Sequence, residues 1–183
     1  MKKLLLFLLF ISGALILQGC LVSEVEQYRL SLNEDGMTWT LSITRRNIES
    51  DSRDTATQRQ DFLELISNWK SDRYLLSQVD RGRYVKSRRL SLEQGKLTWR
   101  ETVIVSDVNT FLPGINLKDE VRFPLQDTTG LRITTNGRIV TEKDSLVILW
   151  PAHTRVFEVK SVRQDFNAQS RFHQRFQSYL KRR

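Results

Sequence analysis

Two stretches of the sequence repeat one pattern, and this pattern restricts the fold more than any other feature. The residues "RLSLNEDGMTW" (29–39) and "RLSLEQGKLTW" (89–99) share Arg, Leu, Ser, Leu, Thr and Trp in register. In each stretch, apolar residues alternate with polar residues on both sides of a short turn that contains glycine, which is typical of an antiparallel hairpin with one buried face. The pattern therefore predicts an antiparallel sheet, built either from a duplicated unit or from two independent hairpins.

Further short strands are predicted in the last third of the chain. The segments 131–135 and 138–142 flank an Asn-Gly dipeptide, which favours a type I′ hairpin turn. The run 146–150 is continuously apolar, which is typical of a central strand covered on both faces, and 155–162 alternates again. Together with the two hairpins, these segments predict an antiparallel meander sheet of seven or eight strands.

Two segments have a helical repeat instead. In 56–70, large apolar residues recur at helical intervals, and Thr55 and Gln58 have the spacing of a capping box. The closing segment has Asp165 as its expected N-cap, and it carries an apolar stripe that consists of Ala168, Phe172, Phe176, Tyr179 and Leu180. The sequence thus predicts an α+β fold, with one internal amphipathic helix and one C-terminal helix packed on the sheet.

The chain begins with a different pattern. Lys2 and Lys3 precede an apolar run from Leu4 to Leu17, which is too short to cross a bilayer of about 30 Å as a helix. A positive start, an apolar middle and a small residue near its end are the parts of a removable secretory signal. The motif "LQGC", which ends at Cys20, resembles the lipobox of bacterial lipoproteins, in which a small residue precedes an invariant cysteine.

This resemblance implies that residues 1–19 are removed and that Cys20 becomes the lipidated first residue. Cys20 is the only cysteine, so the chain has no internal disulfide and no cysteine-based metal site. We expect residues 20–26 to form a lipidated tether and residues 27–183 to form a single domain. Acyl chains on Cys20 would hold this domain at the membrane. The expected location is the cell envelope, at the outer membrane facing the periplasm if the organism is Gram-negative.

The charge of the chain narrows the class of partner. The formal net charge is +8, and removal of Lys2 and Lys3 with the signal leaves +6. A basic protein that is exported and tethered is expected to contact anionic lipid or an acidic envelope protein, and no nucleic acid. The alternative, in which the excess cations only solvate the surface, stays open at this point. The candidate contact residues on the C-terminal segment are Arg171, Arg175, Lys181, Arg182 and Arg183.

Candidate catalytic residues are few. His153 and His173 are the only histidines, and the sequence has no motif typical of a metal site, a phosphate loop or an activated nucleophile. We therefore expect no cofactor, no metal and no enzymatic activity. Two functions stay open. The first, which we favour, is an interaction or structural module that docks through its sheet edge or its basic C-terminal helix. The second is a lipid- or lipoprotein-handling module with an apolar pocket in a curved sheet.

The lipobox hypothesis is tested by replacing Cys20 with Ser, which removes the thiol that forms the thioether to the lipid. We expect the variant to lose incorporation of labelled palmitate and to keep its signal segment, as read from the mass of the purified chain. Gln18→Ala, at a tolerant position of the motif, is the control and should be lipidated normally. A Cys20→Ser variant that is processed as before and stays in the membrane would show that the lipobox interpretation is wrong.

Overall fold

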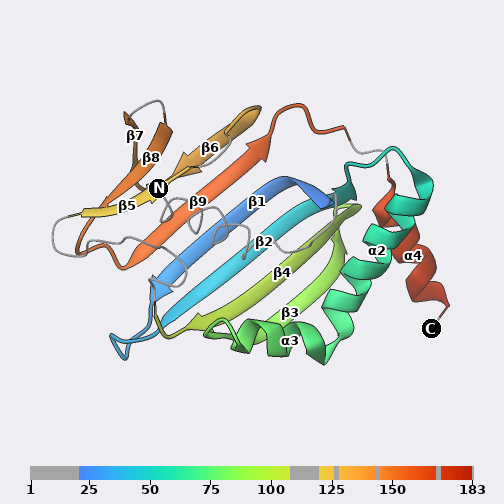
Figure 1. Ribbon diagram of the computed structural model, residues 1–183, viewed down its shortest axis with the longest axis horizontal. Coiled ribbons are helices and arrows are strands. Elements are labelled where there is room, and N and C mark those ends of the chain that lie inside the picture. The colour runs from blue at the N-terminus through green and yellow to red at the C-terminus, as the bar shows by residue number, and fades with distance from the viewer. Residues whose placement is uncertain (1–20, 108–119, 126–127, 143–144, 168–169, 183) are drawn as a thin grey trace, which may run out of the picture.

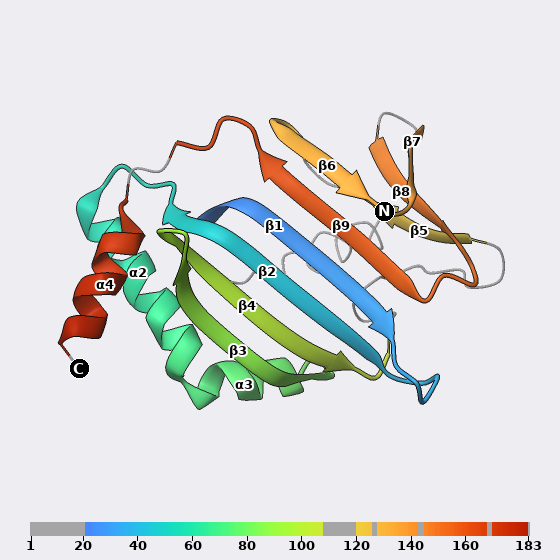
Figure 2. The ribbon, with the colours of Figure 1, turned by 180° about the vertical axis from the view of Figure 1, so that it is seen from behind.

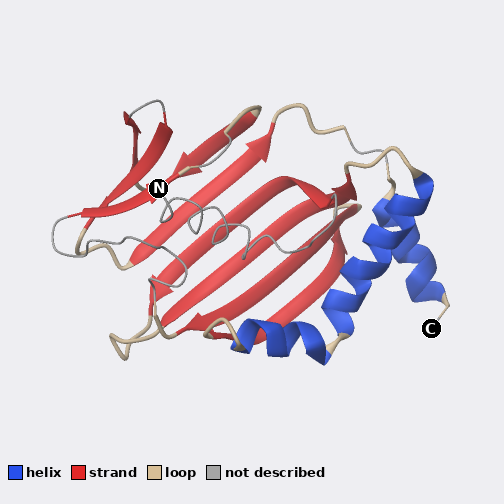
Figure 3. Ribbon diagram, viewed as in Figure 1, coloured by secondary structure: helices blue, strands red, loops and turns tan. Residues whose placement is uncertain are grey.

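The computed structural model describes residues 21–107, 120–125, 128–142, 145–167 and 170–182 (Figure 1). Within these ranges the strands form two antiparallel sheets, which confirms the predicted α+β class. The larger sheet contains, in spatial order, β3 (Arg83–Glu93), β4 (Lys96–Val105), β2 (Trp39–Ser50), β1 (Leu21–Leu32), β9 (Val156–Arg163) and β6 (Leu131–Thr135). The smaller sheet contains β5 (Glu120–Pro124), β8 (Ser145–Pro151) and β7 (Arg138–Glu142). The described helices are α2 (Thr55–Lys70), α3 (Asp72–Val79) and α4 (Phe172–Lys181) (Figure 3).

The two hairpins with the repeated pattern form four neighbouring strands of the larger sheet. β1 pairs with β2, β3 pairs with β4, and the second strands of the two hairpins lie side by side. Trp39 pairs with Val105, and Trp99 pairs with Arg45. Trp99 and Val105 lie sixty residues after Trp39 and Arg45, so each pair is the counterpart of the other with the two strands interchanged. This register relates the hairpins by an approximate twofold rotation. As a consequence, Trp39 and Trp99 lie in two different hydrophobic clusters.

The prediction of a single meander of seven or eight strands is wrong, because the chain changes sheets at Asn136. β6 pairs with β9 and β7 pairs with β8, so the strands on either side of the Asn-Gly dipeptide do not form the expected hairpin. The Asn136 amide donates to the Val156 carbonyl at 2.8 Å and accepts from Trp150 Nε1 at 2.8 Å. A Cβ on Gly137 would lie 2.7 Å from the Trp150 ring, so this corner requires glycine.

The larger sheet begins earlier than the sequence suggested. Strand β1 starts at Leu21, which pairs with Ser50 at the end of β2, so residues 21–26 belong to the sheet and not to a tether. The sequence does not show the apolar–polar alternation of a strand here, because two of its residues are polar: Ser23 is buried, and Glu26 accepts a hydrogen bond from the Tyr28 hydroxyl at 2.7 Å. The described residues are therefore part of the sheet from Leu21 onward.

The predicted internal helix is confirmed as α2, and a second helix that was not predicted, α3, follows it directly. Asp54 is the N-cap of α2, because its carboxylate accepts from Thr57 N at 2.7 Å, and the capping box expected at Thr55 and Gln58 is wrong. Ser71 then ends α2, and its hydroxyl accepts a hydrogen bond from the first turn of α3. One serine thus stops one helix and starts the next, which the apolar spacing alone did not reveal.

The helices and the smaller sheet cover the same face of the larger sheet, at opposite ends (Figures 1 and 3). The helix-side cluster contains Ile48, Phe62, Leu65, Ile66, Leu90, Leu97, Trp99, Phe172 and Phe176. The sheet-side cluster contains Leu30, Trp39, Leu41, Ile43, Val103, Val105, Val121, Ile148, Trp150 and Phe157. Residues 97, 99, 103 and 105 of β4 divide between the clusters and, by strand alternation, share this inner face. The opposite, outer face has no described helix or strand across it (Figure 2).

The C-terminal helix packs against α2, but it begins later than expected. α4 starts at Phe172 and its N-cap is Arg171, whereas Asp165 lies in a turn after β9. Phe172 and Phe176 are 0% and 1% exposed, as the apolar stripe predicted. The prediction for Leu180 is wrong, because this side chain is 48% exposed and the ring of Tyr179 stacks on Phe176 instead. Ala168 of the predicted stripe is outside the described residues.

The helix-side cluster predicts that Phe176 contributes strongly to stability. Phe176→Ala removes a buried ring that contacts Trp69 at a centroid distance of 5.7 Å, and it leaves a cavity. We expect the free energy of unfolding to fall by about 3–5 kcal/mol, measured by denaturant titration. Leu180→Ala on the same helix is the matched control and should change stability by less than about 1 kcal/mol. Equal effects of the two substitutions would contradict this packing.

Candidate functional site

The cations expected on the C-terminal segment lie on or beside α4, as far as they are described. Arg171, Lys181 and Arg182 are exposed, and Arg175 is partly buried with its Nε donating to the Ser170 carbonyl at 3.3 Å. Arg183 and Cys20 lie outside the described residues. Among the described residues, no helix combines the length and the apolar character that crossing a bilayer requires.

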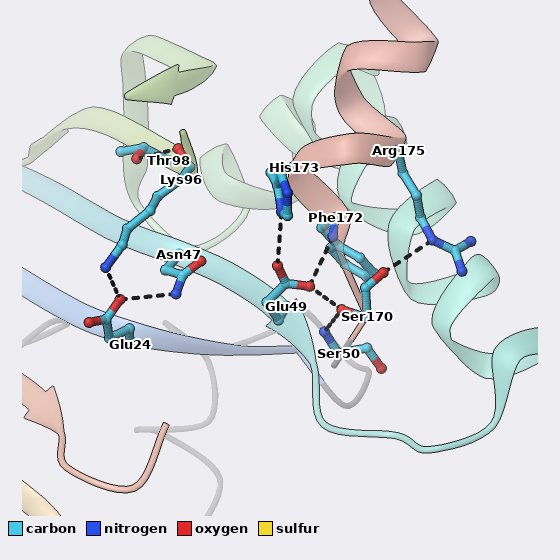
Figure 4. A network of polar contacts seen from close by, with 10 residues as sticks. All are labelled: Glu24, Asn47, Glu49, Ser50, Lys96, Thr98, Ser170, Phe172, His173 and Arg175. Atoms are coloured by element: carbon cyan, nitrogen blue, oxygen red, sulfur yellow. Dashed lines mark hydrogen bonds and ion pairs between the residues drawn. The ribbon is translucent and has the colours of Figure 1, made fainter. Parts of the chain in front are cut away.

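The N-terminus of α4 is bound by a buried carboxylate of strand β2 (Figure 4). Glu49 is 1% exposed, and its Oε2 accepts from the backbone N of Phe172 at 2.9 Å and from the Ser170 hydroxyl. The Ser170 oxygen in turn accepts from the backbone N of Ser50 at 2.8 Å. A carboxylate at a helix N-terminus bonds otherwise unpaired N–H groups and interacts favourably with the helix dipole. Glu49 therefore fastens the last helix to the end of β2.

Because Glu49 caps α4, the side chain of Arg171 has no capping role. Arg171 stands at the N-cap position with φ of 51°, in the left-handed region, and its side chain makes no capping hydrogen bond. Glu49 on β2 accepts the hydrogen bond that an N-cap side chain would usually accept, so the side chain of Arg171 need not turn back toward the helix. The guanidinium of Arg171 is therefore displayed at the surface.

The neighbouring residue of β2 holds the other long helix. The hydroxyl of Ser50 donates to Asp61 Oδ2 of α2 at 2.5 Å, and both residues are buried. Gln58, one turn earlier on α2, donates from its amide to the Ser52 carbonyl at 2.9 Å. The last two residues of β2 thus fix α2 and α4 at the same end of the sheet at which β1 begins.

The two histidines have different surroundings. The Nδ1 of His173 lies 3.9 Å from Glu49 Oε1, at the capped end of α4. His153 is exposed in the turn between β8 and β9. In the described part of the chain, no cluster of histidine, cysteine, aspartate or glutamate has the arrangement of a metal site.

A second polar network crosses the inner face between the two hydrophobic clusters. The hydroxyl of Tyr74 on α3 donates to Glu101 on β4 at 2.9 Å, and Trp99 Nε1 donates to the same carboxylate at 3.3 Å. Burial raises the pKa of Glu101 above its usual range, against the lowering effect of these hydrogen bonds. Burial also raises the pKa of Tyr28, which donates to Glu26, to about 12. This network ties α3 to the sheet.

Sequence reasoning missed both networks. Glu101 had no visible partner in the sequence, because Tyr74 is 27 residues away on a helix that was not predicted. Glu49 is followed by polar residues that are typical of a loop, and its partner Phe172 is 123 residues distant. The available signal was the position of Glu49 at the end of an alternating strand, where a charged side chain requires a partner if it is buried.

Comparisons of this chain with protein-family models, with curated proteins and with solved structures found no match.

The capping role of Glu49 predicts a large loss of stability on its removal. Glu49→Ala leaves the Phe172 N–H and the Ser170 hydroxyl without their acceptor, at a cost of about 1–3 kcal/mol for each buried donor. Unfolding in denaturant measures this loss. Glu49→Gln keeps one acceptor oxygen and should lose less, and Glu34→Ala, in an exposed turn, should lose almost nothing. A Glu49→Ala protein as stable as the Glu34→Ala protein would contradict the capping role.

Proposed function

We propose that this protein is a membrane-anchored envelope lipoprotein that acts as a non-enzymatic interaction or structural module. The observation that carries the proposal is the rigid attachment of α4, which is held by the Glu49 carboxylate and by two buried phenylalanine rings. A helix fixed in this way presents Arg171, Lys181 and Arg182 in a constant geometry. Cations in a fixed arrangement suit recognition of an acidic surface better than cations on a loose tail.

The use of the buried ionisable groups supports a non-enzymatic role. Glu49 is occupied by capping, Asp61 accepts from Ser50, and Glu101 accepts from Tyr74 and Trp99. These carboxylates hold helices onto the sheet. A general acid or base would instead need a position from which it reaches a bound substrate.

The packing of the inner face favours the interaction module over the lipid-handling module. In the sheet-side cluster, the ring of Phe157 contacts those of Trp39 and Trp150 at centroid distances of 5.5 and 5.3 Å. Close contacts between aromatic rings favour a packed core at this end of the inner face, whereas a carrier of acyl chains needs a cavity lined by apolar side chains.

The edges of the larger sheet favour docking through side chains over addition of a partner strand. Edge strand β3 has an irregular register between Val85 and Ser87, with the exposed Lys86 at this point, and edge strand β6 has only five residues. Bulges, exposed lysines and short length are features that discourage pairing at an edge. The candidate contacts are therefore cations, and the candidate partners are anionic lipid or an acidic envelope protein.

The proposed location is the outer membrane, on its periplasmic side, if the organism is Gram-negative. Leu21 and Val22 follow the cysteine, and this absence of Asp resembles the pattern of lipoproteins that are sent onward to the outer membrane in enterobacteria. Fractionation of inner and outer membranes tests this part of the proposal.

The docking role of α4 is tested with the mature chain from residue 20, made without acyl groups as Cys20→Ser. Arg171→Glu together with Arg175→Glu should weaken its salt-sensitive binding to a co-purifying acidic envelope protein by roughly thirtyfold or more, since each cation near an anionic surface contributes about 1 kcal/mol. Arg59→Glu with Arg73→Glu, on α2 and α3, is the control with the same change in charge and should bind normally.

Thermal unfolding of each variant checks that the fold is kept, because Arg175 also donates to the Ser170 carbonyl. If the double reversal leaves association unchanged at every ionic strength, the cations of α4 only solvate the surface and the docking role is wrong.

A further inference from the structure

The outer face of the larger sheet has an uneven distribution of charge along its strands. Residues that pair across neighbouring strands form rows that run across the sheet, and alternate rows have their side chains on the outer face. The row through Val25 contains Arg46 and Arg132, and the next row, through Gln27, contains Arg89, Arg100 and Lys160. These two rows contain five cations and no acidic residue.

The charge falls away in the next two rows. The third row contains Arg29 and Glu158, which form a salt bridge at 2.6 Å and cancel each other. The fourth row passes through Ser31 and contains no charged residue, since its members are Tyr84, Ile104, Thr40, Ser31 and Val156. Among these four rows, the positive charge that is not balanced within a row is thus confined to the first two, which lie in the half of the face toward the start of β1. The row of Glu93 and Lys96, nearer the start of β1, carries one charge of each sign, and the exposed Lys86 lies at the irregularity of β3.

Several of these cations are not neutralised by a neighbour. Arg100 forms a salt bridge with Glu93 at 2.7 Å. In the part of the chain that the structure describes, no salt bridge involves Arg89, Arg132 or Lys160, and all three are exposed. We call these three residues the outer cation set. They come from β3, β6 and β9, so they are spread across the width of the sheet.

The cationic half is the half nearest to Cys20. Leu21 is already paired with Ser50, so no flexible segment separates the sheet from the residue that carries the proposed lipid. At about 3.3 Å per strand residue, the first two rows lie roughly 13 and 20 Å from Leu21, whereas the fourth lies roughly 33 Å away. The domain cannot move far from the bilayer, and its nearest charges remain where the surface potential is felt.

We propose that the cationic half of the outer face lies on the anionic headgroups of the membrane that holds the anchor. This inference rests on the proposed lipidation of Cys20 and adds the orientation of the domain. Serine, threonine and arginine dominate the cationic rows, which suits contact with phosphate groups and not insertion into hydrocarbon. The helices then lie on the far side of the sheet from the bilayer, since they cover the inner face (Figure 2).

The orientation is measured on the full lipidated protein reconstituted in vesicles. Lipidation blocks the only natural thiol, so a cysteine introduced at a chosen site can carry a fluorophore. Thr134→Cys places the label on the outer face in the row of Lys160, and Ser67→Cys places it on α2. Both positions are exposed. Quenching by lipids with a spin-labelled headgroup reports which label is close to the bilayer, with and without phosphatidylglycerol.

We expect the label at 134 to be quenched severalfold more strongly than the label at 67, and only when phosphatidylglycerol is present. Reversal of the outer cation set, by Arg89→Glu, Arg132→Glu and Lys160→Glu, should remove this difference, as should high salt. The matched control reverses three exposed cations elsewhere, by Arg59→Glu, Arg73→Glu and Arg155→Glu, and should keep the difference. Glutamine variants of the outer cation set repeat the test if the reversed variant fails to fold.

Two failures have different meanings. If the protein floats with vesicles but the labels at 134 and 67 are quenched equally in anionic vesicles, the orientation is wrong although the anchor is right. The same conclusion follows if the cations bind an acidic protein and leave the label at 134 far from the bilayer. If the lipidated fraction does not float with neutral vesicles, the anchor itself is wrong, and the orientation that rests on it is contradicted as well.

Discussion

The structure depends on one carboxylate, that of Glu49, which joins the end of β2 to the beginning of α4. It accepts from the Phe172 N–H and the Ser170 hydroxyl, and the adjacent Ser50 donates to Asp61 of α2. These contacts bring both helices to one end of the sheet and close the helix-side cluster around Phe172 and Phe176. A buried carboxylate is stable only if it has hydrogen-bond partners. The buried Phe172 N–H and Ser170 hydroxyl in turn need an acceptor, so the carboxylate and its partners depend on one another.

The helix attachments and the cationic rows of the outer face lie toward the same end of the molecule. β1 begins there at Leu21, the helices are fixed there, and the cationic rows of the outer face lie nearest to it. The other end holds the smaller sheet and an uncharged row of the outer face. With the proposed lipid anchor on Cys20, this polarity would turn one side of the domain to an anionic membrane and leave the helices to other partners.

The parts of the fold that follow from local pattern were predictable. The repeated hairpins, the helix from residue 55 and the burial of Phe172 and Phe176 depend on alternation and helical spacing, which neighbouring residues determine. The remainder depends on distant partners. Asn136 makes a corner because Val156 and Trp150 meet its amide, and Glu49 caps a helix 123 residues away. No local pattern encodes such pairings.

The most direct test of the account is native-state hydrogen exchange of the backbone amides of α4. If Glu49 and the two phenylalanine rings hold the helix as part of the fold, the amides of Phe172 and Phe176 should exchange only on global unfolding. Their opening free energy should then equal that of amides in the middle of β2, such as Ile43. Exchange of the α4 amides at a much lower opening free energy, while β2 stays protected, would show that α4 detaches freely and would contradict the account.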